Sequence, residues 1–225
     1  AIRLTGHLDS VSLNFALSEL IRRHETLRTY FKSVDGTPYQ FIIPARGMTL
    51  AMQSLQIKRR QITRAGEFVL PVYNLESLAE EEKETVLTQK IQEEALTPFK
   101  LGKGQLFRVI LFRLSKDNHV FMLNMHHIIS DGWSVGVMIK EFSTLYQSFV
   151  SGSHSFLPDL PIQYADYSFW QKQWLQGEEL EKQVNYWKQQ LNGVSVLDLP
   201  TDFARPSVMT THGSRVLFQV PAQLT

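Results

Sequence analysis

The sequence predicts an α/β protein, because strand-like and helix-like patterns follow one another along the chain. Residues 120–123 form an apolar run with the β-branched and aromatic bias of a buried strand. From Val135 to Phe149, apolar residues recur every three or four positions, which predicts one buried face of a helix. With 225 residues, the chain can bury a sizeable core, as one large domain or two small ones.

The first elements are a helix and a hairpin. Asp9 is the predicted N-cap of a helix that ends near Arg23, where basic side chains suit the negative end of the helix dipole. Residues 27–31 and 39–43 are predicted as two strands joined through Asp35-Gly36, a strong hairpin signal.

Residues 44–70 fit no regular element and resemble an inserted loop. A loop of this length is uncommon unless it is functional or disordered. It carries a basic cluster at Lys58-Arg59-Arg60 and Arg64. We interpret the cluster as a solvated loop, with docking of a partner domain as the minor alternative.

The middle of the chain is predicted as a helix followed by two strands. Ser77 with Glu80 fits a capping box, and Pro98 ends the helix. Residues 106–114 and 119–125 are predicted as neighbouring strands joined by a turn at Asp117-Asn118. The buried face of the helix is predicted at Val86, Leu87, Ile91 and Ala95.

The last third begins with a loop, because residues 151–161 are rich in Ser, Gly and Pro. Residues 164–175 and 178–191 are predicted as helices and residues 213–220 as a strand. Aromatic residues at helical spacing are usually core, and we assign that role to Trp170, Trp174 and Trp187, with contact to a ligand as the alternative.

Two adjacent histidines, His126 and His127, leave the end of a predicted strand, and Asp131-Gly132 follows. Loops at strand ends before helices are where α/β proteins place chemistry. Adjacent strand residues point to opposite faces, so the two histidines are expected to have different roles. Gly132 is expected to make the tight turn, and Asp131 either to accept bonds from loop amides or to pair with a distant cation. A histidine at a strand end is more often structural than catalytic, so the residue types alone leave both roles open.

Composition excludes several kinds of site. The chain has no cysteine, which excludes disulfides, thiolate metal sites and a cysteine nucleophile. Zinc needs three or four convergent ligands, whereas adjacent histidines point apart, so no metal site is expected. The net charge of +1 gives no reason to expect a nucleic acid or a membrane surface as partner. No signal peptide or bilayer-length apolar run is present, and a cytoplasmic location is expected.

The motifs nevertheless resemble one known family. His126 to Gly132 matches the HHxxxDG signature, within a longer MHHxISDGWS pattern that begins at Met125. Residues 23–31 are similar to an RHExLRTxF motif, and residues 164–171 resemble YxDYAxWQ. All three occur, in this order, in the condensation domains of non-ribosomal peptide synthetases, and together they cover nearly the whole chain.

The resemblance implies a chloramphenicol-acetyltransferase-like α/β fold, in which a two-layer lobe has a mixed sheet with packed helices. It implies that residues 1–160 form an N-terminal lobe carrying the site. Residues 161–225 would then be crossing helices and the start of an incomplete second lobe. Family motifs before and after this region are absent, so we expect a fragment that is inactive by itself.

The resemblance also implies roles for site residues. His127 would assist the attacking amine, His126 would be structural, and Gly132 would present an amide to developing negative charge. Arg23 or Arg28 would form a structural ion pair with Asp131, with Arg23 preferred. The candidates for the substrate tunnel are Ser130, Trp133 and Tyr164.

The implied reaction joins an acyl thioester on a donor carrier domain to the amine of an aminoacyl thioester on an acceptor carrier. The domain itself would bind no cofactor, since phosphopantetheine arms belong to the carriers, and an adenylation domain would be a neighbour. We expect the subtype that joins L-configured residues. Epimerisation of a carrier-bound residue, transfer from coenzyme A and a non-catalytic docking module of the same fold remain alternatives. Heterocyclisation domains replace the first histidines with acids, which this chain does not.

Overall fold

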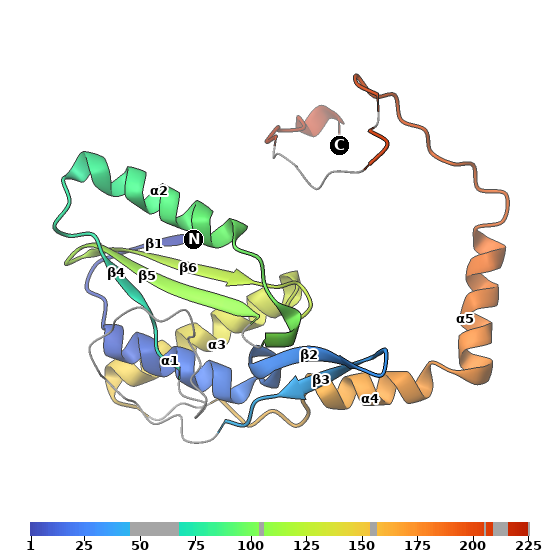
Figure 1. Cartoon of the computed structure of the whole chain (residues 1–225), viewed down its shortest axis with the longest axis horizontal. Helices are drawn as coiled ribbons and strands as arrows, with labels where there is room; N and C mark the ends of the chain where they lie inside the picture. The colour runs from blue at the N-terminus through green and yellow to red at the C-terminus, as the bar shows by residue number, and fades with distance from the viewer. Residues whose placement is uncertain (46–67, 104–105, 154–156, 205, 209–215, 225) are drawn as a thin grey trace. The chain divides into compact units, whose positions relative to one another are not determined.

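The computed structural model describes residues 1–45, 68–103, 106–153, 157–204, 206–208 and 216–224 (Figure 1). It divides into two compact units, Ala1–Gln173 and Trp174–Thr225, each described by itself. This division falls inside a helix, and the lobe boundary near residue 160 stays a prediction. None of the helices in the described ranges combines the length and the hydropathy needed to cross a bilayer. The predicted insertion, with its basic cluster at 58–64, lies almost wholly outside these ranges.

The first unit is built on a mixed four-stranded sheet. β6 runs antiparallel to both of its neighbours, β1 and β5, whereas β4 runs parallel to β5. The predicted strand pair is therefore confirmed, with its turn one residue earlier, at Lys116-Asp117. The order across the sheet is β1 (Ile2–Thr5), β6 (Asn118–Met125), β5 (Phe107–Ser115) and β4 (Val72–Asn74).

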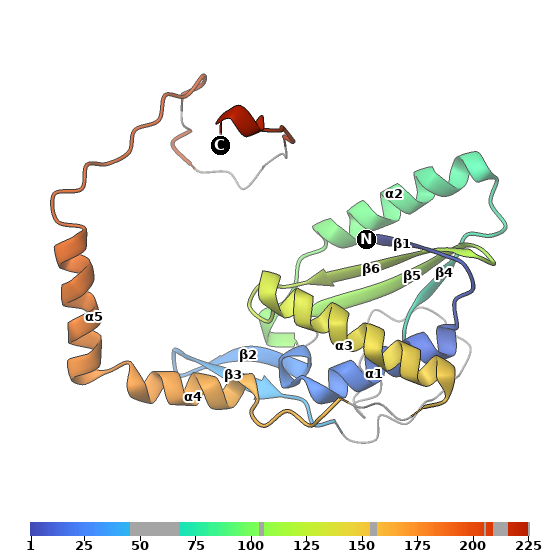
Figure 2. The same cartoon turned by 180° about the vertical axis from the view of Figure 1, so that it is seen from behind.

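Helices cover both faces of this sheet (Figures 1 and 2). α2 (Glu80–Leu96) lies on one face, and α1 (Ser10–Arg23) packs beside α3 (Gly132–Ser151) on the other. Side chains alternate along β5: Val109 joins the core under α1 and α3, and Ile110 joins the core under α2. Burial on both faces explains why this strand is apolar almost throughout. The predicted mixed sheet with packed helices is confirmed, and α2 adds a second helical layer.

The N-terminal helix α1 follows the prediction. The carboxylate of Asp9 accepts hydrogen bonds from the backbone N–H groups of Val11 (2.9 Å) and Ser12 (3.1 Å), so it caps the helix. The helix ends at Arg23, and His24 is its C-cap, in an extended conformation. This places the RHE motif where α1 stops.

The hairpin consists of β2 (Thr29–Val34) and β3 (Thr37–Ile42), after a short 3₁₀ helix η1 (Glu25–Arg28). Its turn residues Asp35 (φ 49°) and Gly36 (φ 80°) are both left-handed. Left-handed residues at both positions are typical of the tight turns that suit strand twist. The hairpin is confirmed. Another 3₁₀ turn, η2 (Leu101–Lys103), lies between α2 and β5.

Two predictions for α2 are wrong. The helix begins at Glu80 with Ala79 as its N-cap and no side-chain cap bond, so Ser77 lies too early to form a capping box. Ala95 is exposed, whereas Leu87 is buried against the sheet. The acidic first turn and the end before Pro98 are confirmed.

The last helices match their predicted ranges, as α4 (Tyr164–Trp174) and α5 (Gly177–Gln190). Their tryptophans are not core: Trp170, Trp174 and Trp187 are between 45% and 56% exposed. The reason is that nothing in the described ranges buries any residue of either helix. The predicted final strand is also wrong where it is described, since residues 216–220 have no strand structure and are followed by a 3₁₀ turn, η3 (Ala222–Leu224).

Candidate active site

The histidine pair lies where β6 passes into α3. β6 ends at Met125, and the backbone N–H of His126 donates to the carbonyl of Leu106 at 2.8 Å, which extends the pairing with the neighbouring strand by one bond. The chain then folds into a short loop, in which the N–H of Ile129 donates to the carbonyl of His126. α3 starts at Gly132, so residues 126–131 form a compact bridge between strand and helix.

The two histidines face different surroundings, as strand alternation predicts. His126 is partly buried: its ring lies edge-on to Phe99, and its Nδ1 accepts from the backbone N–H of Ile128 at 3.0 Å. His127 is exposed and lines a pocket. The structure thus leaves the ring of His127 open to a ligand and ties the ring of His126 to the loop.

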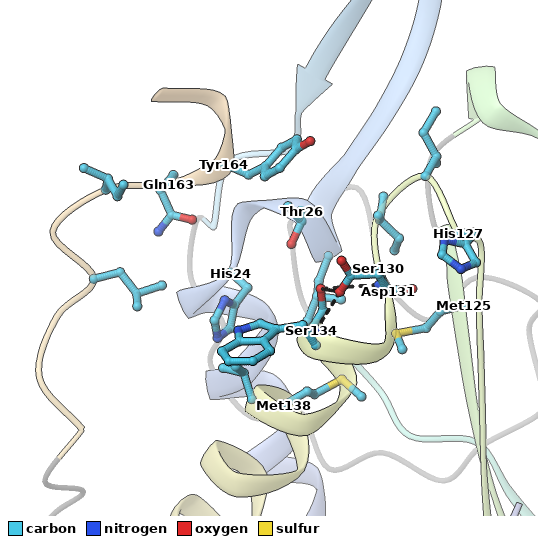
Figure 3. A pocket seen from close by; sticks show the side chains of 17 residues that line it. His24, Thr26, Met125, His127, Ser130, Asp131, Ser134, Met138, Gln163 and Tyr164 are labelled. Carbon is cyan, nitrogen blue, oxygen red and sulfur yellow. Dashed lines mark hydrogen bonds between the residues drawn. The ribbon is translucent and has the colours of Figure 1, made fainter. Parts of the chain in front are cut away.

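Asp131 is the N-cap of α3. Its Oδ1 accepts from the Ser134 hydroxyl at 2.6 Å and from the Ser134 backbone N–H at 2.8 Å, drawn as dashed lines in Figure 3. The Ser134 hydroxyl in turn accepts from the backbone N–H of Asp131, which completes a capping box. These hydrogen bonds, that of the hydroxyl foremost, hold the pKa of the Asp131 carboxyl below its ordinary value.

Gly132 does not have the expected turn conformation. It is the first residue of α3, and its φ is not positive. A Cβ atom placed on it would meet nothing within 4 Å. The turn is made by the loop before it, so the structure gives no steric or backbone reason for glycine here.

The predicted ion pair between Asp131 and an arginine is not found, because both arginines are engaged elsewhere. Arg23 pairs with Glu141 of α3 (Nε to Oε2, 3.1 Å), and both residues are buried. Arg28 is also buried, and it donates to the carbonyls of Ile21 (3.0 Å), Arg22 (3.1 Å) and Ile43. Asp131 instead keeps its hydrogen bonds within its own helix start, the other alternative that the sequence left open.

The pocket has a volume of about 390 Å³ and is bounded by separate parts of the first unit (Figure 3). The start of α3 and the histidine loop form one part of its lining, and the end of α1 with the segment before α4 forms another. The predicted tunnel residues Ser130, Trp133 and Tyr164 all line it, with His127. Figure 3 shows His24 and His127 on different sides, with Ser130 and Asp131 between them.

Two further lining residues were given no role by the sequence. His24 contacts Glu141 through Nε2 (2.6 Å to Oε2), and Gln163 bonds to the main chain on either side of His24. His24 stands in the RHE motif, directly after the last residue of α1. The RHE motif was therefore the sequence signal for His24, whereas Glu141, which His24 contacts, belongs to no motif.

The described ranges contain no group of three or more His, Asp or Glu side chains that could hold a metal ion. The polar groups that line the pocket are the imidazoles of His24 and His127, several hydroxyls, the carboxylate of Asp131 and the amide of Gln163.

Comparisons with known proteins agree with the motifs. A family model for the condensation domain matches residues 1–225. The chain is 38% identical over 215 residues to one of the linear gramicidin synthase proteins of Brevibacillus parabrevis, and 39% identical over 222 residues to surfactin synthase subunit 1 of Bacillus subtilis. These matches cover 95% and 98% of the chain, but only 2% and 5% of the synthetases. The chain thus spans a small part of the curated relatives that it matches.

Solved structures agree as well. The X-domain from teicoplanin biosynthesis superposes with a TM-score of 0.70 at 27% identity, over 92% of this chain and 41% of that one. The epimerization domain from the third module of tyrocidine synthetase B has a TM-score of 0.67 at 23% identity, over 91% of this chain and 42% of that one. This second likeness concerns the fold alone. With the family model matched from end to end, the chain belongs to the condensation-domain family of non-ribosomal peptide synthetases, as its motifs predict.

Proposed function

We propose that the protein containing these residues forms amide bonds between two carrier-bound substrates. The donor is an acyl or aminoacyl thioester on one carrier domain, and the acceptor is the amine of an aminoacyl thioester on another. The observation that carries the proposal is His127, exposed in a pocket of about 390 Å³ at the junction of β6 and α3. Membership of the family supports the reaction class.

The reaction needs a proton acceptor and no metal or redox step. The lone pair of the amine attacks the thioester carbonyl carbon, the carbon–sulfur bond breaks, and the proton lost by the amine ends on the thiol of the donor arm. In its neutral form, the imidazole of His127 accepts that proton during attack and returns it to the sulfur. General-base assistance of this kind contributes about 10²–10⁴-fold.

Positioning supplies the larger part of the rate. Two tethered reactants held in line can gain about 7–11 kcal/mol from proximity and orientation. In our proposal His126 and Asp131 serve this end by holding the loop, through the bonds to Ile128 and Ser134. The backbone N–H of Gly132, at the positive end of α3, is a proposed donor to the oxygen that becomes negative as the amine adds.

The partners follow from the reaction. We propose that donor and acceptor carrier domains deliver their substrates on phosphopantetheine arms, that an adenylation domain of the same assembly line loads the acceptor, and that the protein acts in the cytoplasm. The motif form around Ser130 supports the subtype that joins two L-configured residues. Ser130, Trp133 and Tyr164 are proposed to contact the arms, since all three line the pocket.

The test uses the full-length parent synthetase with both carriers loaded, and follows dipeptide by intact-protein mass spectrometry. His127→Ala is expected to lower the rate about 10²–10⁴-fold while the carriers stay loaded. His7→Ala removes an exposed histidine outside the pocket lining and serves as the control, with an unchanged rate.

Other outcomes separate the alternatives. An unchanged rate in His127→Ala would refute the role of this residue. Scrambled configuration of a single loaded residue, without a dipeptide, would assign epimerisation. A wild-type protein that binds loaded carriers and transforms neither would be a docking module.

A further inference from the structure

A partly buried arginine outside the pocket is linked to the histidine loop. Arg108, on β5, has a side chain that is 18% exposed, and among the described residues it is not part of the pocket lining. Burying a guanidinium is costly unless its charge and its N–H groups are satisfied. The groups that satisfy Arg108 show which parts of the molecule it holds together.

Arg108 fastens the end of α2 to the sheet. Its Nη2 donates to the carbonyls of Glu94 (2.8 Å) and Thr97 (2.6 Å), and its Nε lies 3.2 Å from the carboxylate of Glu94. Asn124 of β6 donates to the same Glu94 carbonyl at 3.0 Å. The last carbonyls of a helix have no partner within the helix and lie at its negative end. A cation at this point therefore fixes where α2 stops and where the next residues begin.

Phe99 is one of those next residues, and its ring faces the guanidinium. The Cζ atom of Arg108 is 3.9 Å from the centre of the Phe99 ring, which is the geometry of a cation–π contact. The ring of Phe99 is in turn almost perpendicular to that of His126, at 82°, with the ring centres 5.9 Å apart. Edge-to-face rings at this separation attract one another. Arg108, Phe99 and His126 thus form a row of three packed side chains.

His126 holds the loop on which His127 lies. Its Nδ1 accepts from the backbone N–H of Ile128 at 3.0 Å, and its carbonyl accepts from the N–H of Ile129 at 3.1 Å. Rotation of the ring breaks the first of these bonds. Phe99 restricts that rotation, because it packs against the ring.

We propose that Arg108 and Phe99 position His126 and, through it, the loop that presents His127 to the substrates. They are positioning residues, since they act through His126 and not on the substrate. The proposal rests on the proposed function for its effect on the reaction rate. Its effect on the loop follows from the contacts alone, so the two can be measured separately.

The first test measures dipeptide formation in the full-length parent synthetase, in a single turnover with both carriers loaded. Phe99→Leu keeps an apolar side chain without the ring, and it is expected to lower the rate by about tenfold, since a misplacement of about 1 Å can cost about 10²-fold. Phe99→Tyr keeps the ring and is expected to stay within about twofold of the wild type. Arg108→Lys keeps the charge but lacks the flat guanidinium that stacks on the ring, and its rate is expected to fall between these two.

Tyr73→Leu is the matched control. Tyr73 is a partly buried aromatic residue of β4, and its ring is stacked on that of Phe112, with the centres 5.4 Å apart. The substitution removes a packed ring from the same sheet, and an unchanged rate is expected. A double-mutant cycle tests the route: in a His126→Ala background, Phe99→Leu is expected to cause no further loss of rate.

The second test observes the histidine loop without a reaction. The 225-residue chain has seven histidines, few enough for their ring resonances to be assigned by NMR with His126→Ala and His127→Ala. Phe99→Leu is expected to shift the ring resonances of both His126 and His127, because the first loses its neighbour and the second moves with the loop. Tyr73→Leu is expected to shift neither. The same spectra report whether each variant is folded.

The outcomes separate this proposal from the proposed function. An unchanged rate in Phe99→Leu, an equal loss in Tyr73→Leu, or a further loss in the His126→Ala background would each overturn the proposal, with the proposed function intact. A parent that forms no dipeptide would refute the proposed function, and the spectra would then decide. Shifts of both histidines in Phe99→Leu would leave the positioning role standing, whereas a shift of His126 alone would overturn it.

Discussion

The pair of Arg23 and Glu141 joins α1 to α3 beneath the pocket, and its removal gives the sharpest test of the structure. Glu141→Ala leaves the guanidinium of Arg23 buried without its carboxylate, in a residue that is only 8% exposed. An uncompensated buried charge of this kind costs about 3–5 kcal/mol of unfolding free energy. In a domain of this size, that loss lowers Tm by about 6–20 °C.

The assay is urea denaturation of the 225-residue chain, followed by tryptophan fluorescence and circular dichroism. Glu19→Ala is the matched control, because it breaks the exposed pair with Arg22 on the same helix, and it is expected to cost less than about 1 kcal/mol. Arg23→Met combined with Glu141→Leu removes both charges, and most of the stability is expected to return. A Glu141→Ala variant no less stable than Glu19→Ala, or a double variant no more stable than Glu141→Ala, would refute the reasoning.

Three further predictions concern a helix cap and two glycines. Asp9→Ala is expected to cost about 1 kcal/mol, since it removes the N-cap of α1. The pKa of the Asp9 carboxyl is lowered, chiefly by the hydrogen bond from the backbone N–H of Ser12. The extra stability of the wild type over Asp9→Ala is therefore complete above about pH 3.8, the ordinary pKa, and is lost as the pH falls through the lowered pKa. Thermal unfolding of both proteins as a function of pH checks this. Gly36→Ala places a side chain at φ +80° and is expected to cost about 1–2 kcal/mol, whereas Gly136→Ala, inside α3 and with open space around it, is expected to gain about 0.5–1 kcal/mol in the same urea assay.

Local patterns predicted the frame of the molecule well. The cap at Asp9 and the turn at Asp35-Gly36 each depend on neighbours within a few residues, and the strand pair that ends at the histidines is joined by a short turn. Such signals are complete in the sequence, because the atoms that satisfy one another are close along the chain. The different surroundings of His126 and His127 were also predicted, from strand alternation, although β6 ends at Met125 and both histidines lie in the loop after it.

Signals that depend on distant burial were less reliable. An aromatic stripe at helical spacing predicts a buried face, but it does not say which part of the chain supplies the cover. In α4 and α5 the described residues fully bury no side chain, so Trp170 and Trp187 stay more than half exposed. Ser77 failed differently: the spacing of a capping box was present, but the helix begins three residues later, at Glu80.

The choice of partner for Arg23 shows why a motif cannot assign an ion pair. Asp131 is marked by its place in HHxxxDG, but its carboxylate is exposed and already satisfied by Ser134 at the start of α3. Glu141 has no motif, yet it lies along α3 where α1 packs against it, and burial there demands a cation. Asp131, the N-cap of α3, therefore shapes the histidine loop, whereas Glu141 within α3 holds α1, the helix that ends next to His24. Arg23 and Glu141 are 118 residues apart in the sequence, so only the packing of α1 on α3 reveals that the two acids have different roles.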